Sequence, residues 1–281
     1  MNYINDLVKT FWKYQALRFP DLLNYFDKEN KNTGRPPVFL KSKEWMNVLL
    51  NSNASEDEKN KTLHMILPEK RHLWFASMKS SQALAQSILG NLAVYSKLDY
   101  LNEINDEEYN EALLSSASTL SIDFSLEHEV ISFEEPRRTS LDAFIKGDYQ
   151  IAIECKLAEI DVGNCSRPKL TEKDSNYFTD HCDGSYTFQK NRNDRCSLTG
   201  IGVTYWEYIP KLFNWKSNVD LIPCPLNHNY QLVRNILSAC IRPDGIIAED
   251  NGHALLIYDE EILLFNNLEK VLSLIWKLKD H

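Results

Sequence analysis

The chain has 281 residues, of which 43% are hydrophobic and 25% are charged. This is an ordinary globular composition, and the chain is long enough to bury a sizeable core. The formal net charge of −9 argues against a protein that coats nucleic acid, because such binding relies on many Lys and Arg contacts to phosphate. The N-terminal segment has no apolar signal-peptide run, and no stretch is long and apolar enough to span a bilayer. We therefore expect a cytoplasmic protein.

Helical patterns dominate the first hundred residues. Apolar residues recur every three to five positions from Tyr3 to Phe26, and helical signals return over 44–50 and 59–66. A further helix is predicted to begin at Ser80 or Ser81, either of which can cap it. Its predicted apolar face contains Leu84, Ile88, Leu92 and Tyr95, which leaves Gln82 and Gln86 on another face.

Strand patterns begin near residue 126. Three strands are predicted over 126–133, 139–145 and 150–157, joined by turn-forming segments into a meander. Residues 160–225 look irregular, and 230–240 look helical. The remaining predicted elements are two strands around an Asn-Gly turn and a closing helix, over 245–249, 253–258 and 268–278.

Three charged residues lie within the predicted meander, where apolar residues surround them. Strand side chains alternate, so Glu154 and Lys156 share one face while their apolar neighbours share the other. Asp142 stands between Leu141 and Ala143, where burial of a charge is costly without a partner or a metal. Two carboxylates brought together by paired strands suit Mg²⁺, which takes one or two carboxylates together with substrate phosphate.

This arrangement resembles the PD-(D/E)XK nuclease superfamily. The shared pattern is an acidic residue in one strand, a short hairpin, and an acid-any-Lys triplet in the next strand. The Pro that usually precedes the first acid is replaced here by Leu141. Four further blocks are similar to a bacterial branch of restriction endonucleases: Ser80-Ser81-Gln82-Ala83, Ile153-Glu154-Cys155-Lys156, Cys165-Ser166-Arg167-Pro168 and Tyr205-Trp206-Glu207-Tyr208-Ile209-Pro210.

The resemblance implies roles for individual residues. Asp142 and Glu154 would bind Mg²⁺ or Mn²⁺, and Lys156 would orient or deprotonate the attacking water and stabilise charge on phosphorus. Gln82 would be the residue that the first core helix supplies to the site, with Glu129 as a second candidate. The alternatives are an ordinary ion pair at a solvated strand end for the Glu154–Lys156 triplet, and a surface position for Gln82 and Glu129.

The resemblance also implies an α/β fold, a restriction-endonuclease-like core whose central mixed sheet is flanked by helices. We expect one nuclease domain over 1–281. Within it, 1–79 would be a helical elaboration, 80–160 and 226–281 the core, and 161–225 a cysteine-containing insertion.

Six cysteines without a signal peptide argue against a disulfide framework, because the cytosol is reducing. Cys155 and Cys240 are expected in the core. The other four lie in the irregular segment, where they could form a structural zinc site or remain buried free thiols: Cys165, Cys182, Cys196 and Cys224.

Basic residues gather near the predicted site and could contact DNA phosphates, with Tyr186 and Phe188 between them to stack on bases. They are Arg137, Arg138, Arg167, Lys169, Lys190, Arg192 and Arg195. Arg167 is the strongest single candidate for substrate binding, and scattered solvated charge is the alternative for each.

The sequence therefore favours a metal-dependent endonuclease that hydrolyses DNA phosphodiester bonds. Restriction or phage defence, and a homodimer that cuts both strands, are expectations from the resemblance alone. The rival hypothesis is a catalytically inactive nuclease fold that binds DNA or a protein partner. The sequence contains no Gly-rich phosphate loop, no Gly-x-Ser-x-Gly elbow and no His-Glu-x-x-His run.

Overall fold

The computed structural model describes residues 3–30, 33–103, 123–136, 138, 140–147, 149–159, 161–248 and 252–258. These residues form a mixed α/β structure. The helices are α1 (Tyr3–Arg18), α2 (Glu56–His64), α3 (Ser81–Ala85), α4 (Asn91–Val94), α5 (Tyr177–Asp180), α6 (Ser197–Gly200), α7 (Tyr205–Leu212) and α8 (Leu226–Cys240). The strands are β1 (Asp123–Glu129), β2 (Ser140–Lys146), β3 (Gln150–Lys156) and β4 (Gly252–Tyr258).

Shorter helical segments connect these elements. A π turn, Gln86–Gly90, joins α3 to α4. The 3₁₀ segments are Pro20–Tyr25, Lys28–Asn30, Lys41–Asn47, Pro68–Lys70, Leu98–Glu103 and Arg167–Lys169.

The four strands form one sheet in the order β1-β2-β3-β4. The first three are an antiparallel meander, as the sequence predicted, and β4 joins β3 in parallel. Gln150 pairs with Gly252 at one end of the parallel pair and Lys156 with Tyr258 at the other. The sheet is therefore completed by a segment far along the chain from the meander.

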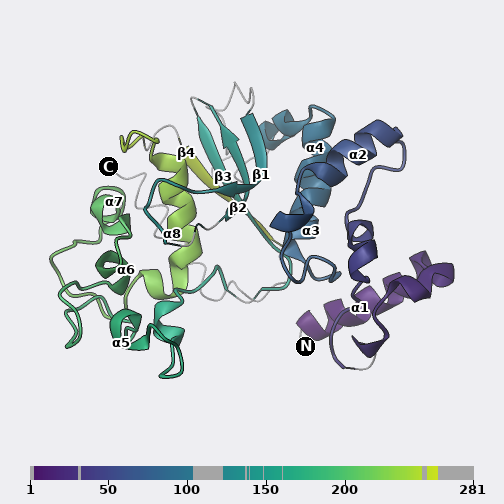
Figure 1. Ribbon diagram of the computed structural model, residues 1–281. Coiled ribbons are helices and arrows are strands. Elements are labelled where there is room, and N and C mark those ends of the chain that lie inside the picture. Colours follow the sequence, from purple (N-terminus) through teal and green to yellow (C-terminus); the bar gives the residue numbers. More distant parts are fainter. Residues whose placement is uncertain are drawn as a thin grey trace.

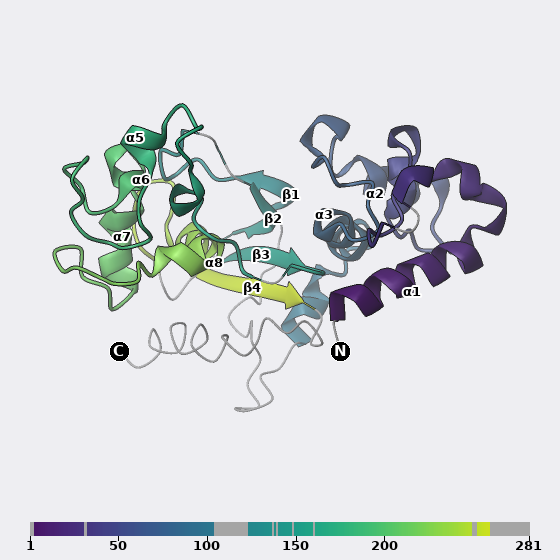
Figure 2. The same ribbon diagram turned by 90° about the horizontal axis from the view of Figure 1, so that it is seen from below.

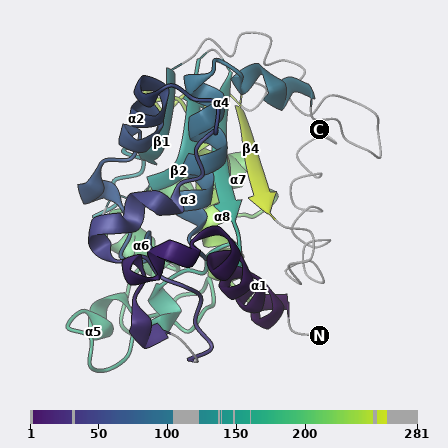
Figure 3. The same cartoon turned by 90° about the vertical axis from the view of Figure 1, so that its right-hand side faces the viewer.

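Helices cover both faces of the sheet. On one face, α8 packs against β3 and β4; on the other, α3 packs against β2 and β3 (Figure 1). Figure 3 shows α2, α3 and α4 in front of the sheet, with α8 behind it. The loop-rich segment with α5, α6 and α7 lies on the far side of α8 from α1, as the view from below shows (Figure 2).

The strand alternation divides the core into two layers. Ile151, Ile153 and Cys155 are fully buried on the α3 side, where they pack with Leu89 of the π turn. Ala152 faces the other way and packs into the larger cluster built around α7 and α8. Glu154 and Lys156 share that second face, so α8 supplies their surroundings.

Most predicted elements are confirmed, with three corrections. Ser80 caps α3 as expected, but the predicted apolar face is wrong: Ile88 is exposed, whereas Gln82 and Gln86 are buried. Gln86 Nε2 donates to the carbonyls of Thr62 and Leu63, which satisfies the amide nitrogen inside the core, whereas Oε1 is buried without a partner among the described residues.

The other two corrections concern the second half of the chain. Residues 205–212, expected to be irregular, form α7, and its strongly one-sided apolar pattern explains its burial. Of the strand predicted over 245–249, the described residues 245–248 form a single bridge, between Ile241 and Ile247. The predicted helix over 268–278 lies outside the described residues.

Candidate active site

The strand register brings Asp142 and Glu154 together. Ala143 pairs with Ile153 across β2 and β3, so the preceding Asp142 stands opposite the following Glu154. Neighbouring strands are about 4.8 Å apart, which is close enough for two carboxylates to share an ion or repel each other. The sequence-predicted pair is therefore one site on two adjacent strands.

Glu154 is held by amide side chains of α8. It is buried, and its Oε1 accepts a hydrogen bond from Gln231 Nε2 at 2.5 Å. Its Oε2 accepts from Asn235 Nδ2 at 3.0 Å. Gln231 and Asn235 are one helical turn apart, so both reach the same carboxylate. Glu154 thus has a defined orientation despite lying in the core.

Lys156 completes this cluster. Its ammonium lies 2.9 Å from Glu154 Oε1 and donates to Gln231 Oε1 at 2.8 Å. Burial lowers the pKa of Lys156, but the Glu154 carboxylate more than offsets this effect and holds the pKa above its usual value. The buried side chain is therefore a fixed positive charge beside the carboxylates.

Asp142 has a different environment. Its Oδ2 accepts a hydrogen bond from the Cys155 backbone N–H at 2.7 Å, and Oδ1 accepts none from a described residue. Burial, with a further contribution from the Glu154 charge, raises the pKa of Asp142 to about 8. A carboxyl that resists ionisation in the metal-free protein is stabilised as a carboxylate by a bound cation.

Sequence reasoning missed the contribution of α8. Gln231, Arg234 and Asn235 all point into the protein, and Arg234 Nη2 donates to the Ser140 carbonyl beside Asp142 at 3.1 Å. The available signal was three polar residues at helical spacing within a segment predicted as a helix. The sequence does not show which strands this helix packs against, so the signal did not indicate which face of the helix is buried.

Gly163 makes room for the Gln231 side chain. It has a left-handed φ of +86°, and a Cβ at this position would lie 2.3 Å from Gln231 Oε1. The Gly163 carbonyl also accepts a hydrogen bond from the Gln231 backbone N–H at 3.3 Å. The loop after β3 is thus fitted against the residue that orients Glu154.

Glu127 is another residue that sequence reasoning missed. It lies in β1, is only 4% exposed, and forms an ion pair with His72, Oε2 to Nε2, at 3.8 Å. This pairing with Glu127 raises the pKa of the His72 imidazole, and burial partly opposes the shift. Glu129, the predicted candidate, is instead 44% exposed at its side chain and pairs with Lys70 and Arg138, each at 3.6 Å.

Gln82 lies next to this cluster, but its side-chain amide is bonded to backbone groups. Its Oε1 accepts from the His72 backbone N–H at 2.8 Å, and its Nε2 donates to the Lys70 carbonyl at 3.2 Å. It therefore positions the loop that carries His72. Its proposed contact with substrate remains a prediction.

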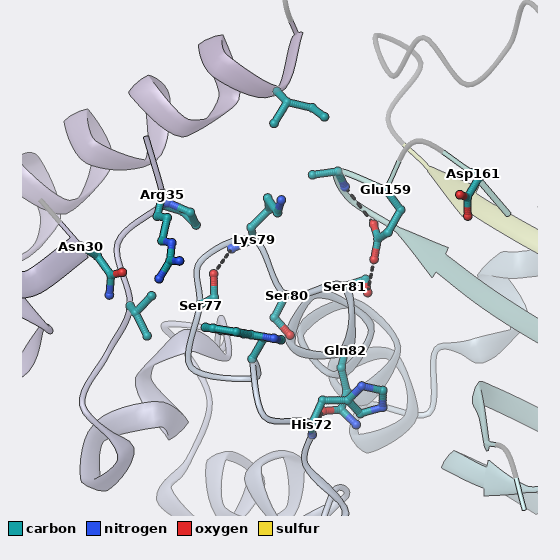
Figure 4. A pocket seen from close by; sticks show the side chains of 15 residues that line it. Asn30, Arg35, His72, Ser77, Lys79, Ser80, Ser81, Gln82, Glu159 and Asp161 are labelled. Carbon is teal, nitrogen blue, oxygen red and sulfur yellow. Dashed lines mark hydrogen bonds between the residues drawn. The ribbon is translucent and has the colours of Figure 1, made fainter. Parts of the chain in front are cut away.

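A cavity of about 680 Å³ adjoins the end of β3. Arg35 lies on its N-terminal side, and Glu159, which accepts a hydrogen bond from Ser81 at 2.8 Å, lies on the sheet side (Figure 4). His72 and Gln82 also line it, whereas Asp142, Glu154 and Lys156 do not. The cavity thus adjoins this cluster at His72, whose imidazole pairs with Glu127.

The basic residues predicted as a DNA-binding rim have mixed surroundings. Arg167 pairs with Asp180 at 2.9 Å, and its side chain is only 20% exposed. Arg192 donates to backbone carbonyls, including that of His181 at 3.1 Å, and Arg195 pairs with Asp220 at 2.9 Å. Arg137 lies outside the described residues. Direct DNA contact by these residues, Arg167 included, remains a prediction.

The four cysteines of the irregular segment are free thiols near one another. Burial raises the pKa of Cys165 to about 12, and the nearby Cys196 and Cys182 add to the shift. Across the described part of the chain, however, no group of three or more His, Cys, Asp or Glu side chains is arranged to hold an ion. The zinc site remains a prediction. Cys155 and Cys240 are buried, as expected.

The carboxylate site fits a divalent metal by its donor chemistry. Asp142 Oδ1 accepts no hydrogen bond from a described residue, and Glu127 Oε1 is buried without one. Carboxylate oxygens are the ligands that Mg²⁺ and Mn²⁺ prefer. Asp142 and Glu154 are therefore the residues that would hold the ion, with Lys156 as a fixed neighbouring charge.

A mixed sheet flanked by helices, with buried acids and a lysine on adjacent strands, defines an α/β protein with a candidate acidic site. The chain matches the family described as "Restriction Endonuclease associating with ARP" over residues 21–275 and belongs to it. Membership in a restriction endonuclease family implies DNA as the substrate class. No curated protein and no solved structure matches the chain. None of the described helices is long and apolar enough to cross a membrane.

Proposed function

We propose that this protein is a metal-dependent endonuclease that hydrolyses DNA phosphodiester bonds with a PD-(D/E)XK-type site on a restriction-endonuclease-like core. The observation that supports it most is the joint placement of Asp142 and Glu154 on adjacent strands, with Lys156 2.9 Å from Glu154. Restriction or defence against phage is the role that the family suggests.

The two acids would hold Mg²⁺ or Mn²⁺. When bound, such an ion lowers the pKa of water, polarises the phosphoryl oxygen and aligns the attack. Asp142 has an oxygen without a described partner, whereas both oxygens of Glu154 are already bonded. Gln231 and Asn235 would therefore act as positioning residues that keep Glu154 directed at the ion.

Lys156 would stabilise the negative charge that develops on the phosphoryl group. Its raised pKa keeps the ammonium protonated at neutral pH, which favours this role over removal of a proton from water. Gln231 shares hydrogen bonds with both Lys156 and Glu154. One amide thus fixes the distance between the positive charge and the metal-binding carboxylate.

The test is cleavage of plasmid and single-stranded DNA by the parent protein and by Glu154→Ala, each with Mg²⁺, with Mn²⁺ and with chelator. We expect metal-dependent cutting that the variant loses while its circular dichroism spectrum is unchanged. If neither protein cuts any substrate and neither metal stabilises the parent against heat, the chain is instead a binding module with a nuclease fold.

A further inference from the structure

Three carboxylates stand in a row across three adjacent strands. Leu126 pairs with Ala143 and His128 with Leu141, which places Glu127 opposite Asp142. Asp142 in turn stands opposite Glu154. The Glu127 charge contributes to the raised pKa of Asp142, so the two carboxylates are electrostatic neighbours as well as neighbours in the register.

The burial of the Glu127 carboxylate is energetically unfavourable. It is 4% exposed, and its Oε1 has no hydrogen-bond partner among the described residues. In the described part of the chain, the partner of its Oε2 is His72, at 3.8 Å, a side chain that is itself 67% exposed. A buried carboxylate with an unpartnered oxygen beside another carboxylate is unfavourable unless a cation offsets the charge.

The backbone points to the same residue. Glu127 adopts a left-handed φ of +50° within a strand, a conformation that non-glycine residues rarely adopt. The regular pairing of β1 with β2 is interrupted at this residue. The strand therefore departs from its ladder at the one position that faces Asp142.

We propose that Glu127 is a third carboxylate ligand of the metal centre and binds a divalent cation together with Asp142. This inference rests on the proposed function, because it extends the same site by one ligand. In the present arrangement no group of three ligands is closed around an ion in the described part of the chain. Metal binding would draw Glu127 Oε1 and Asp142 Oδ1 towards a common ion.

Glu127→Gln tests the proposal, because glutamine keeps the shape and removes the charge. Binding of Mn²⁺ alone is measured by calorimetry and by the thermal shift that it causes. We expect the Kd for Mn²⁺ to rise at least about tenfold, since affinity follows the number of charged ligands. We also expect the melting temperature without metal to rise, because a buried carboxylate with one unpartnered oxygen is lost.

Asp123→Asn is the matched control, because it also turns an acid into its amide. Asp123 begins the same strand and is exposed, so neither Mn²⁺ affinity nor the metal-free melting temperature should change. Glu127→Asp is a second variant that keeps the charge but shortens the side chain. It should weaken Mn²⁺ binding without raising the metal-free melting temperature.

Unchanged Mn²⁺ affinity in both Glu127 variants would overturn the inference, as would a parent protein that binds no Mn²⁺. The proposed function would survive the first result if binding still depends on Glu154 and the parent still cuts DNA. A Glu127→Gln protein that loses melting temperature and keeps its Mn²⁺ affinity would show a structural role only.

Discussion

Two regions of this protein carry residues that the sequence marks as possible metal ligands, and the structure treats them differently. The acids Glu127, Asp142 and Glu154 lie on adjacent strands in fixed register. The four cysteines lie just before or after short helices in the segment between β3 and α8, and their thiols are free. Neither set closes around an ion in the described residues.

The two sets differ in what fixes the distances between their side chains. A sheet sets neighbouring strands about 4.8 Å apart whatever the side chains are, so acids in register meet. Loops have no such repeat, and their side chains meet only if tertiary packing brings them together. The carboxylates also have an environment that explains them as a set, namely a buried lysine, two amides and a histidine.

The largest loss of activity is expected when the buried lysine beside the carboxylates is removed. We expect Lys156→Ala to lower the DNA cleavage rate by about 10²- to 10³-fold, the usual effect of losing one fixed charge-stabilising group. Lys146→Ala, at the exposed end of β2, is the control. Equal loss in both variants, or none in Lys156→Ala, would contradict the role assigned to Lys156.

The loop after β3 offers a second way to disturb the cluster. Gly163→Ala would place a Cβ 2.3 Å from Gln231 Oε1 and displace the amide that orients Glu154. We expect cleavage to fall by about 10- to 100-fold, as for other residues that support metal ligands. Single-turnover cleavage with saturating metal measures it.

Gly202→Ala is the control for Gly163→Ala. Gly202 has a similar left-handed φ, +95°, but a Cβ there meets nothing within 4 Å. Both variants carry the backbone strain, and only one meets Gln231. If Gly202→Ala loses as much activity as Gly163→Ala, strain rather than the contact with Gln231 is the cause.

Asp142 should make the stability of the metal-free protein depend on pH. Burial raises its pKa to about 8 in the folded state from an ordinary value of 3.8. The folded protein therefore retains a proton that the unfolded chain releases, and folding weakens as pH rises through this interval. Asp142→Asn removes the effect, so its stability relative to the parent should increase with pH by at most about 1.4 kcal/mol per unit.

Denaturant unfolding with chelator at several pH values measures this difference. Added Mn²⁺ should instead make the parent the more stable protein, because the parent has the Asp142 carboxylate to bind the ion and the variant does not. A difference that does not vary between pH 4.5 and 7.5 would mean that Asp142 ionises at its ordinary pKa in the folded protein, and would contradict the prediction.

The smallest effect is expected in the cysteine segment. If the thiols bind no metal, Cys165→Ser should lower the free energy of unfolding by about 1–2 kcal/mol, because a hydroxyl replaces a buried apolar thiol. Cleavage should stay within about twofold, since Cys165 contacts none of the three catalytic candidates. Cys240→Ser, buried in α8, is the comparison.

Metal analysis of the purified protein completes that test. One zinc per chain, with a much larger loss of stability in Cys165→Ser than in Cys240→Ser, would show that the thiols close around an ion. That result would make the loop segment a metal-stabilised unit and remove the contrast with the strand acids.

The sequence predicted the strands that carry the candidate residues, for a physical reason. Asp142, Glu154 and Lys156 lie in a meander whose alternation and short turns specify which residues meet. Ser80 was one of the two serines predicted to cap this helix, and it accepts the capping hydrogen bond from the Ala83 backbone N–H. These features depend on neighbours within a few residues.

The missed features depend on distant partners. The amides of Gln231 and Asn235 reach Glu154 across about 80 residues of chain. Glu127 was not predicted, because the left-handed backbone conformation at this position is not visible in the strand pattern of the sequence. The burial of Gln82 and Gln86 depended on backbone carbonyls of the segment before α3, which no helical pattern reveals.

The parallel pairing of β3 with β4 has a consequence for how the protein is made. The paired residues are about one hundred positions apart in the chain, and α8 lies between them in sequence. On the ribosome, Glu154 and Lys156 therefore emerge long before the amides that orient them and the strand that flanks them. The order of synthesis thus separates the appearance of the reactive side chains from their assembly, and a nascent chain that ends before α8 carries the acids and the lysine without an ordered site.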